Sequence, residues 1–228
     1  MLRRFLIVVL ISSLVVLALT RIVDRELPLL ESSNERGVIG AFHIHSESSH
    51  DSSLTLDELT RTAAAIGLDF IIVTDHNNQI GGPVQRNGVL VVSSAEVSTP
   101  FGHLIQLGAD RVPEREHRSG LDIHSRLRAN GAVPILAHPT DPKRPWTGPL
   151  EGIGGLEVVN LSTAARQIGG PIFVGLLPNL ITYRLNPTLA VAQLYSRDPR
   201  ALERWDAESD PRIVGLCGVD AHRRSRAA

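Results

Sequence analysis

The sequence is poor in several residue types, and each scarcity excludes a class of protein. Cysteine occurs once in 228 residues, at Cys217, so an intramolecular disulfide and a cysteine-rich zinc module are both excluded. Aromatic residues make up 4% of the chain, and the formal net charge is -1 at pH 7. Such a balance provides no basic surface, so we do not expect nucleic acid as a partner. The sequence contains no Gly-x-Ser-x-Gly motif for a nucleophilic serine.

A hydrophobic segment opens the chain. Residues 5–20 are all uncharged, and arginines flank them on both sides. This pattern predicts a signal anchor or a signal peptide over residues 1–23, with the first arginines in the cytoplasm. The remainder would then be extracytoplasmic, in a periplasm or at a cell surface, and either held at the membrane by this helix or secreted after cleavage. Residues 24–36 are polar and predict a linker, which leaves residues 37–228 for one domain.

Strand and helix patterns alternate over residues 37–228. Short runs rich in Ile and Val are typical of buried strands, and a capping box of Thr55 and Glu58 predicts a helix between the first two. This order favours an α/β fold with a parallel sheet, most simply a barrel. The chain stops six residues after His222, so we expect the helix that should close the barrel to be absent. We therefore expect a partner or a missing segment to cover the last strand.

Histidines and carboxylates collect at the predicted strand ends. His43 and His45 end the first strand, where a period of two puts both side chains on one face. Other strand ends carry Asp75, His76, Glu96, His103, His138, Asp220 and His222. The carboxyl ends of parallel barrel strands meet at one mouth, and imidazole with carboxylate suits zinc, manganese or iron. The pattern therefore predicts a shared metal site, whereas His117 and His124 are expected on the surface of a charged helix.

Six stretches between residues 41 and 222 carry these side chains in order. They are FHIHSESSHDSSLTLDEL, GLDFIIVTDHN, SAEVSTPFGHLIQLG, ILAHP, GLEVVN and GVDAH. Together they resemble the PHP (polymerase and histidinol phosphatase) family, and the Glu-Val-Ser-Thr with its following Gly-His is most similar to the metallohydrolase branch. The resemblance implies a distorted seven-stranded (β/α) barrel of the TIM-like type. It also implies a centre of two or three divalent ions of Mn, Zn or Fe.

The resemblance also implies roles for individual residues. Nine look like metal ligands: His43, His45 and Asp220 for a first ion, Glu96 as the bridge to a second, His103 and His138 for the second, and Asp51, His76 and His222 for a third. One extra residue after His45 leaves His50 as an alternative to Asp51. Asp75 is expected to orient a ligand histidine, and Glu157 with Asn160 to support the ligands or to contact substrate.

The implied reaction is hydrolysis by a metal-bound hydroxide, with phosphoesters of a small metabolite or nucleotide as the leading substrates. Lys143 and Arg144 follow His138 in a proline-rich loop, and with Arg166 they are candidate phosphate contacts. Hydrolysis of a carboxylic ester or carbamate at the same centre remains an alternative, as does a metal-binding domain without catalysis. Amidohydrolases also open with His-x-His, but many bridge their ions with a modified lysine, and the only lysine here is not at a strand end.

Overall fold

The chain forms two compact units. The computed structural model describes residues 2–23, 25, 37–167, 180–195, 199–208 and 210–223. One unit combines Met1–Ser33 with Ile168–Arg197, and the other combines Asn34–Gln167 with Asp198–Ala228. Every candidate site residue belongs to the second unit. The predicted linker, except Arg25, lies outside the described residues, and the predicted domain boundaries remain predictions.

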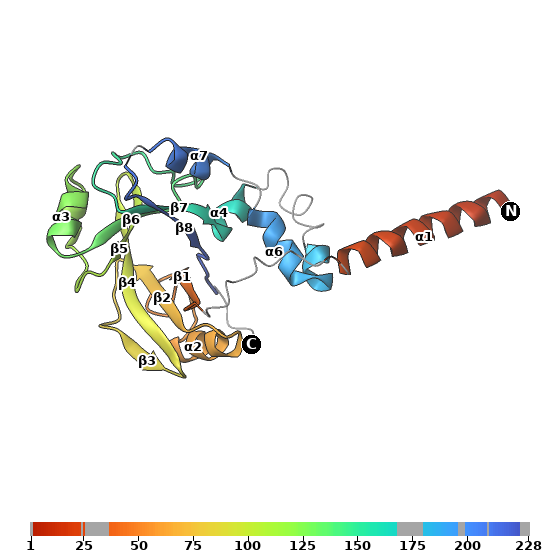
Figure 1. Ribbon diagram of the computed structural model, residues 1–228, viewed down its shortest axis with the longest axis horizontal. Coiled ribbons are helices and arrows are strands. Elements are labelled where there is room, and N and C mark those ends of the chain that lie inside the picture. Colours follow the sequence, from red (N-terminus) through yellow and green to blue (C-terminus); the bar gives the residue numbers. More distant parts are fainter. Residues whose placement is uncertain are drawn as a thin grey trace. The chain divides into compact units, whose positions relative to one another are not determined.

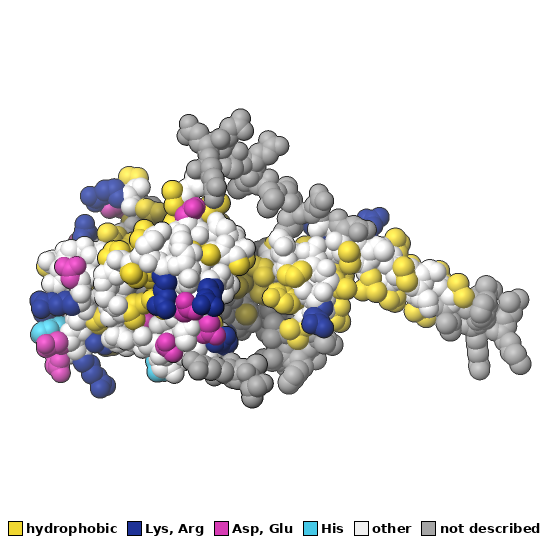
Figure 2. Space-filling view, turned by 90° about the horizontal axis from the view of Figure 1, so that it is seen from below, with side chains coloured by type: hydrophobic (Ala, Val, Ile, Leu, Met, Phe, Trp, Pro, Cys, Tyr) yellow, Lys and Arg dark blue, Asp and Glu magenta, His cyan; other side chains and the backbone are white. Residues whose placement is uncertain are grey.

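The first unit contains the helices α1 (Leu2–Val23) and α6 (Pro187–Tyr195). Asn186 caps α6, because its side-chain oxygen accepts a hydrogen bond from the Leu189 amide at 3.0 Å. Hydrophobic side chains are exposed along the described part of α1 (Figure 2). Even so, none of the helices within the described residues combines the length and apolarity that a membrane span requires. The signal anchor predicted over residues 1–23 is therefore not supported.

The second unit is built on one sheet that curves into a nearly closed barrel (Figure 1). Seven strands follow one another in the sheet: β1 (Gly40–Ile44), β2 (Phe70–His76), β4 (Val89–Thr99), β5 (Gly102–Leu107), β6 (Val133–Ala137), β7 (Gly155–Asn160) and β8 (Val214–Gly218). A short strand, β3 (Val84–Arg86), pairs only with β4. The chain beyond β8 returns to β1, where the His45 amide donates to the Ala221 carbonyl at 3.1 Å. The α/β class and the barrel-shaped sheet are thus confirmed.

One part of the sheet departs from the predicted parallel order. The strand β4 runs parallel to β2, but from Glu96 onward it pairs antiparallel with β5, and β5 is also antiparallel to β6. The two residues between β4 and β5 allow only a hairpin, because a parallel crossover needs a dozen or more residues. Since β5 runs in the opposite direction, its first residues lie beside the end of β4. This reversal places His103 at the same end of the barrel as Glu96.

Helices pack against the sheet in the second unit: α2 (Leu56–Ala65), α3 (Ile123–Ala129), α4 (Leu161–Arg166), α7 (Arg200–Asp206) and the 3-10 helix η1 (Arg115–Arg118). The predicted capping box opens α2, with the Glu58 amide donating to Thr55 Oγ1 at 3.1 Å. His124 was wrongly expected on the surface. It shares a face of α3 with Leu127, is 2% exposed, and donates from Nδ1 to the Glu151 carbonyl at 2.9 Å. Cys217 lies in β8 but is exposed.

Side chains from strands that are not neighbours fill the barrel interior. Phe42 of β1 packs with Ile105 of β5 and with Ile135 and Ala137 of β6. Because β2 and β4 separate β1 from β5 in the sheet, this contact runs through the interior. Ala137 directly precedes His138, so the packed interior lies beneath the residues that follow β6. We call the end of the barrel reached by the carboxyl ends of β1, β2, β6, β7 and β8 the mouth.

Candidate metal centre

All nine predicted ligands lie at the mouth. They come from the ends of β1 and β2, the middle of β4, the start of β5, and the segments that follow β1, β6 and β8: His43, His45, Asp51, His76, Glu96, His103, His138, Asp220 and His222. A cavity of about 290 Å³ opens here and is lined by seven of the nine. The structure thus brings together residues separated by up to 179 positions in the sequence (222 minus 43). Their roles as ligands remain predictions.

Unusual backbone conformations aim three of these side chains. His43, His138 and Asp220 have φ values of 67°, 32° and 51°, in the left-handed region that costs a non-glycine residue about 1–3 kcal/mol. In β1 the pairing with β2 shifts between Phe42 and Ile44, so His43 sits in a bulge. The His-x-His pair is therefore not the regular period-two pair that the sequence predicts. The two rings nevertheless meet, with centroids 5.2 Å apart.

Glu96 occupies the centre of the cluster. Its Oε1 is 2.6 Å from His103 Nδ1 and 2.7 Å from His138 Nε2. Its Oε2 faces three further imidazoles at 3.1–3.5 Å: those of His76, His45 and His43. Burial raises the pKa of this carboxyl, but the charge of His43 and hydrogen bonds from the imidazoles outweigh burial and hold the pKa well below its usual range. Glu96 is therefore ionised, with each oxygen directed to a different set of histidines.

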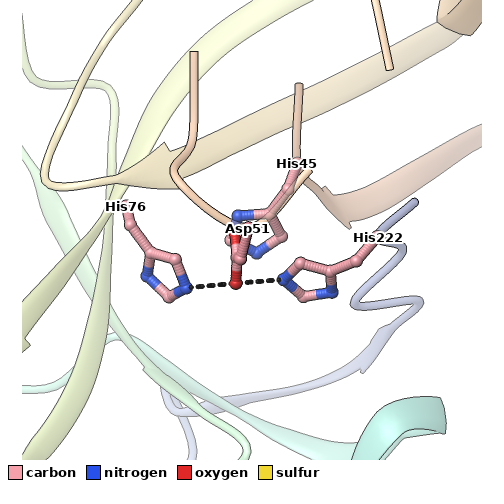
Figure 3. Close-up of side chains that lie close together, drawn as sticks. All are labelled: His45, Asp51, His76 and His222. Carbon is pink, nitrogen blue, oxygen red and sulfur yellow. Dashed lines mark hydrogen bonds and ion pairs between the residues drawn. The ribbon is translucent and has the colours of Figure 1, made fainter. Parts of the chain in front are cut away.

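A second group surrounds Asp51 (Figure 3). Asp51 Oδ2 lies 3.2 Å from His76 Nε2 and 3.1 Å from His222 Nε2. With His45, these residues offer four ligand atoms that all lie within 4.8 Å of one another. His50, the alternative to Asp51, has an exposed side chain whose ring centroid is 4.9 Å from that of His76. The geometry favours Asp51, because one of its oxygens reaches two imidazoles at once.

The donor atoms of the cluster fit divalent cations. Three more groups have ligand atoms within 4.8 Å of one another: His43, His45 and Glu96; His43, His138 and Asp220; and His76, Glu96 and His103. Five buried ring nitrogens of the cluster make no hydrogen bond, although the first four in this list lie 3.1–3.5 Å from a carboxylate oxygen: His43 Nε2, His45 Nε2, His76 Nδ1, His222 Nε2 and His138 Nδ1. An unpaired buried polar atom is costly, whereas an imidazole nitrogen with a free lone pair is a good ligand for zinc and similar metals. Imidazole nitrogens and carboxylate oxygens that face one another without a hydrogen bond are the arrangement that a cation-binding centre requires.

Glu157 supports two of the predicted ligands. Its Oε1 accepts from His43 Nδ1 at 2.6 Å, and its Oε2 accepts from the His138 amide at 2.6 Å and from Asn160 Nδ2 at 2.8 Å. Because Nδ1 of a neutral His43 donates here, its free lone pair is on Nε2, which faces Glu96 and Asp220. Glu157 therefore fixes the tautomer of His43.

Asp75 holds the loop after β1. Its two oxygens accept from the amide and the hydroxyl of Ser46, both at 2.6 Å. Burial raises the pKa of Asp75, although the bonds from Ser46 lower it. These hydrogen bonds fix Ser46, the residue next to His45, and the orientation of a ligand histidine by Asp75 stays a prediction.

The three residues predicted to contact phosphate all line the cavity, but their side chains have different partners. Arg144 Nη1 lies 3.0 Å from His103 Nε2, and since a guanidinium only donates, Nε2 accepts and Nδ1 carries the proton toward Glu96. Arg166 forms an ion pair with Asp141. Lys143 is exposed. Asp141 was not among the predicted residues. Its signal is an acidic residue three positions after His138 in the loop that carries the basic residues.

Cation binding at this site is expected to release a proton. Burial lowers the pKa of His43, but the surrounding carboxylates, Glu157 first, outweigh it and raise the pKa well above 6.5. Protonated His43 therefore stabilises the cation-free fold at low pH, and this stabilisation is lost as pH rises through the raised pKa. A cation needs the unprotonated ring, so its affinity should increase with pH as long as the pH is below that raised pKa.

Calorimetry in two buffers of different ionisation enthalpy measures this proton. His45 should contribute none, because burial and the charge of His43 lower its pKa to about 3. An affinity that does not change between pH 6 and 8, with no proton released, would show that His43 is not a ligand.

A larger cavity, of about 810 Å³, lies at the other end of the barrel. It is lined by α3 and by the segments before β7 and β8, including His124, Arg128 and Glu208. Among the described residues, none of the groups that could hold an ion includes a residue of this cavity. We therefore place the candidate site at the smaller cavity, where the clustered imidazole nitrogens and carboxylate oxygens lie.

Comparison with known proteins adds only structural neighbours. No protein-family model matches the chain, and no curated protein matches it significantly. One solved structure is a two-domain protein from Bacteroides vulgatus ATCC 8482 containing a predicted PHP-like metal-dependent phosphoesterase. It shares 18% identity with a TM-score of 0.40, over 57% of this chain and 50% of that chain.

Another neighbour is a predicted metal-dependent phosphoesterase from Bifidobacterium adolescentis ATCC 15703. It shares 13% identity with a TM-score of 0.46, over 84% of this chain and 91% of that chain. The present chain spans about half the length of the first of these proteins. At such identities and scores the likeness carries no information about substrate. Of these two neighbours, the first contains a predicted PHP-like metal-dependent phosphoesterase, the type of protein that the sequence motifs resemble, and the second is a predicted metal-dependent phosphoesterase.

Proposed function

We propose that this chain is a metal-dependent hydrolase of the PHP type that cleaves phosphoesters of small phosphorylated molecules. The observation that carries the proposal is the cluster at the mouth, where five buried imidazole nitrogens lack a hydrogen-bond partner around an ionised Glu96. Two or three divalent ions held there would activate water and stabilise charge on the reacting oxygen atoms. No serine or cysteine nucleophile is then needed.

The residues around the cluster would hold and orient both ligands and substrate. Glu157 keeps Nε2 of His43 directed at the centre, and the two oxygens of Glu96 reach opposite sets of histidines. The cavity of about 290 Å³ suits a small polar group, and Lys143 and Arg144 on its wall are cations at an exposed edge. Cationic donors of this kind recognise phosphate oxygens.

A pair of synthetic substrates with the same leaving group tests the proposal. The full chain, loaded with Mn, Zn or Fe, is given para-nitrophenyl phosphate and para-nitrophenyl acetate. We expect metal-dependent hydrolysis of the phosphate, lost in His138→Ala. Turnover of the acetate alone would favour the carboxylic ester reaction. No turnover with any of the ions would favour a metal-binding domain without catalysis.

Arg144→Ala is expected to separate phosphate from ester hydrolysis. Removing a charged donor from an anion site should lower kcat/KM for the phosphate by roughly tenfold to a hundredfold, because the guanidinium interacts with phosphate charge and not with a neutral ester. The acetate rate should change by less than about threefold. Arg61→Ala is the matched control, since Arg61 is an exposed arginine of α2 that pairs with Asp57. Equal losses on both substrates would exclude Arg144 as a phosphate contact.

A further inference from the structure

Asp141 is a buried carboxylate at the edge of the cavity with no role in the arrangement described so far. It is 1% exposed and follows His138 by three residues, with its amide donating to the His138 carbonyl at 3.0 Å. Burial raises the pKa of Asp141, but donors from Lys143 and Arg166 outweigh it and hold the pKa below its usual range. Burying an ionised carboxylate costs several kcal/mol of folding free energy unless hydrogen bonds and ion pairs compensate for the lost water. The partners of Asp141 therefore indicate its role.

The two oxygens of Asp141 hold two different basic elements. Oδ1 accepts from the backbone amides of Lys143 at 2.7 Å and Arg144 at 3.2 Å, which fixes the loop after β6. Oδ2 pairs with the Arg166 guanidinium and accepts from Thr163 Oγ1 at 3.4 Å, which fixes a side chain from α4. One carboxylate therefore joins the loop and the helix that supply all three cationic side chains of the cavity.

The same two elements are tied to the residues that support the metal ligands. Asn160 caps α4 by accepting from the Thr163 amide at 2.9 Å, and it donates to Glu157 Oε2 at 2.8 Å. Glu157 in turn contacts His43 and the His138 amide at 2.6 Å. The position of the cationic side chains is thus set relative to the candidate metal centre by a continuous chain of hydrogen bonds.

We propose that Asp141 is a positioning residue that holds the Arg144 loop and Arg166 in register at the mouth, so that together they form a binding site for a phosphate oxyanion. The inference rests on the proposed function, because the oxyanion is taken to be the phosphate group of the substrate. Asp141 itself acts through Arg144 and Arg166 and does not contact the phosphate. Preference for anionic substrates would then depend on Asp141, although Asp141 is itself negatively charged.

Removing Asp141 should change phosphate affinity in opposite directions, depending on whether the residue acts by positioning the cationic side chains or only through its own charge. If Asp141 acted only through its charge, its removal would leave the mouth more positive and would tighten binding of anions. If it acts by positioning, its removal should weaken binding, because misplaced donors no longer reach the oxyanion together. The two expectations are opposite for the same substitution.

Titration calorimetry of the metal-loaded full chain with inorganic phosphate measures this sign. Asp141→Asn keeps an oxygen for the loop amides but offers an amide group to Arg166, whereas Asp141→Ala removes both contacts. We expect phosphate affinity to fall by roughly tenfold in Asp141→Asn and further in Asp141→Ala, with metal content unchanged. Asp122→Asn, which removes an exposed carboxylate paired with Arg126 at 2.7 Å, should have no effect. Unchanged or tighter phosphate binding in Asp141→Asn would overturn the inference, as would loss of metal.

Two further measurements keep the inference distinct from the proposed function. In Asp141→Asn the loss for para-nitrophenyl phosphate should appear mainly in KM, whereas a merely destabilised protein would lose kcat with its folded fraction. Hydrogen exchange of the peptide covering residues 141–147 should be faster in Asp141→Ala even if the chain hydrolyses nothing, and unchanged exchange there would overturn the positioning role. If the parent chain binds phosphate but hydrolyses no phosphoester, the proposed reaction fails while the role of Asp141 stands.

Discussion

Glu96→Gln is expected to dismantle the metal centre. The substitution keeps the shape of the side chain but replaces a charge that faces five imidazoles with a neutral amide, one atom of which donates. A bridging ligand is lost and protonated histidines lose their counter-charge, so at least one ion per chain should disappear. Hydrolysis should fall on the order of a thousandfold. Elemental mass spectrometry and the phosphate assay measure the two losses together.

The control for this substitution is Glu151→Gln, since Glu151 is an exposed carboxylate away from the mouth. It should retain both metal and activity. Circular dichroism shows whether Glu96→Gln still folds. A folded Glu96→Gln protein with its full metal content and more than about a tenth of the activity would exclude Glu96 as a bridging ligand.

Gly218→Ala should have a similar effect from outside the ligand set. A Cβ atom at Gly218 would lie 1.8 Å from Glu157 Oε1 and 2.5 Å from its Cδ, distances that no real contact reaches. Glu157 is fully buried and cannot move without abandoning His43, the His138 amide or Asn160. Because such supporting contacts tune metal sites, metal affinity should fall by about 10–100-fold. Leaving the carboxylate unpaired should also lower the free energy of unfolding by roughly 3–5 kcal/mol.

Denaturant unfolding and metal titration of the same preparation test this expectation. Gly82→Ala is the matched control, because Gly82 has an ordinary backbone conformation and open space where its Cβ would lie. That substitution should be neutral or slightly stabilising. A Gly218→Ala protein as stable as Gly82→Ala, with parent metal affinity, would contradict the tight packing of Glu157 against the β8 backbone.

The position of the candidate ligands could be predicted because the sequence shows where most strands end. Where an apolar run is followed by His or Asp, that residue lies at the carboxyl end of a strand and therefore at the mouth, whatever helices connect the strands. The capping box at Thr55 also marks the start of α2. The sequence predicts a strand over residues 103–107 but not its antiparallel direction, since the pattern of apolar residues in a short strand does not depend on the direction of the strand. His103 still reached the mouth because the hairpin brings the start of β5 to the end of β4.

Other features depend on tertiary contacts that no local pattern carries. The bulge at His43 lies in the pairing of β1 with β2, and His138 and Asp220 adopt a left-handed backbone that their residue types do not predict. Asp141 gains its importance from Arg166, which is 25 positions away in the sequence. His124 looked like a residue of a charged helix, but the face it occupies on α3 turns it toward the core. The location of the chain in the cell and its partners stay predictions.

The number of metal ions per chain tests the central claim most directly. The full chain would be purified without chelators or a His tag, and its metals counted by elemental mass spectrometry against protein concentration. The clustered imidazoles and the bridging position of Glu96 predict two or three divalent ions per chain. Fewer than one ion per chain in folded protein, even after incubation with Mn, Zn or Fe, would contradict a multinuclear hydrolase.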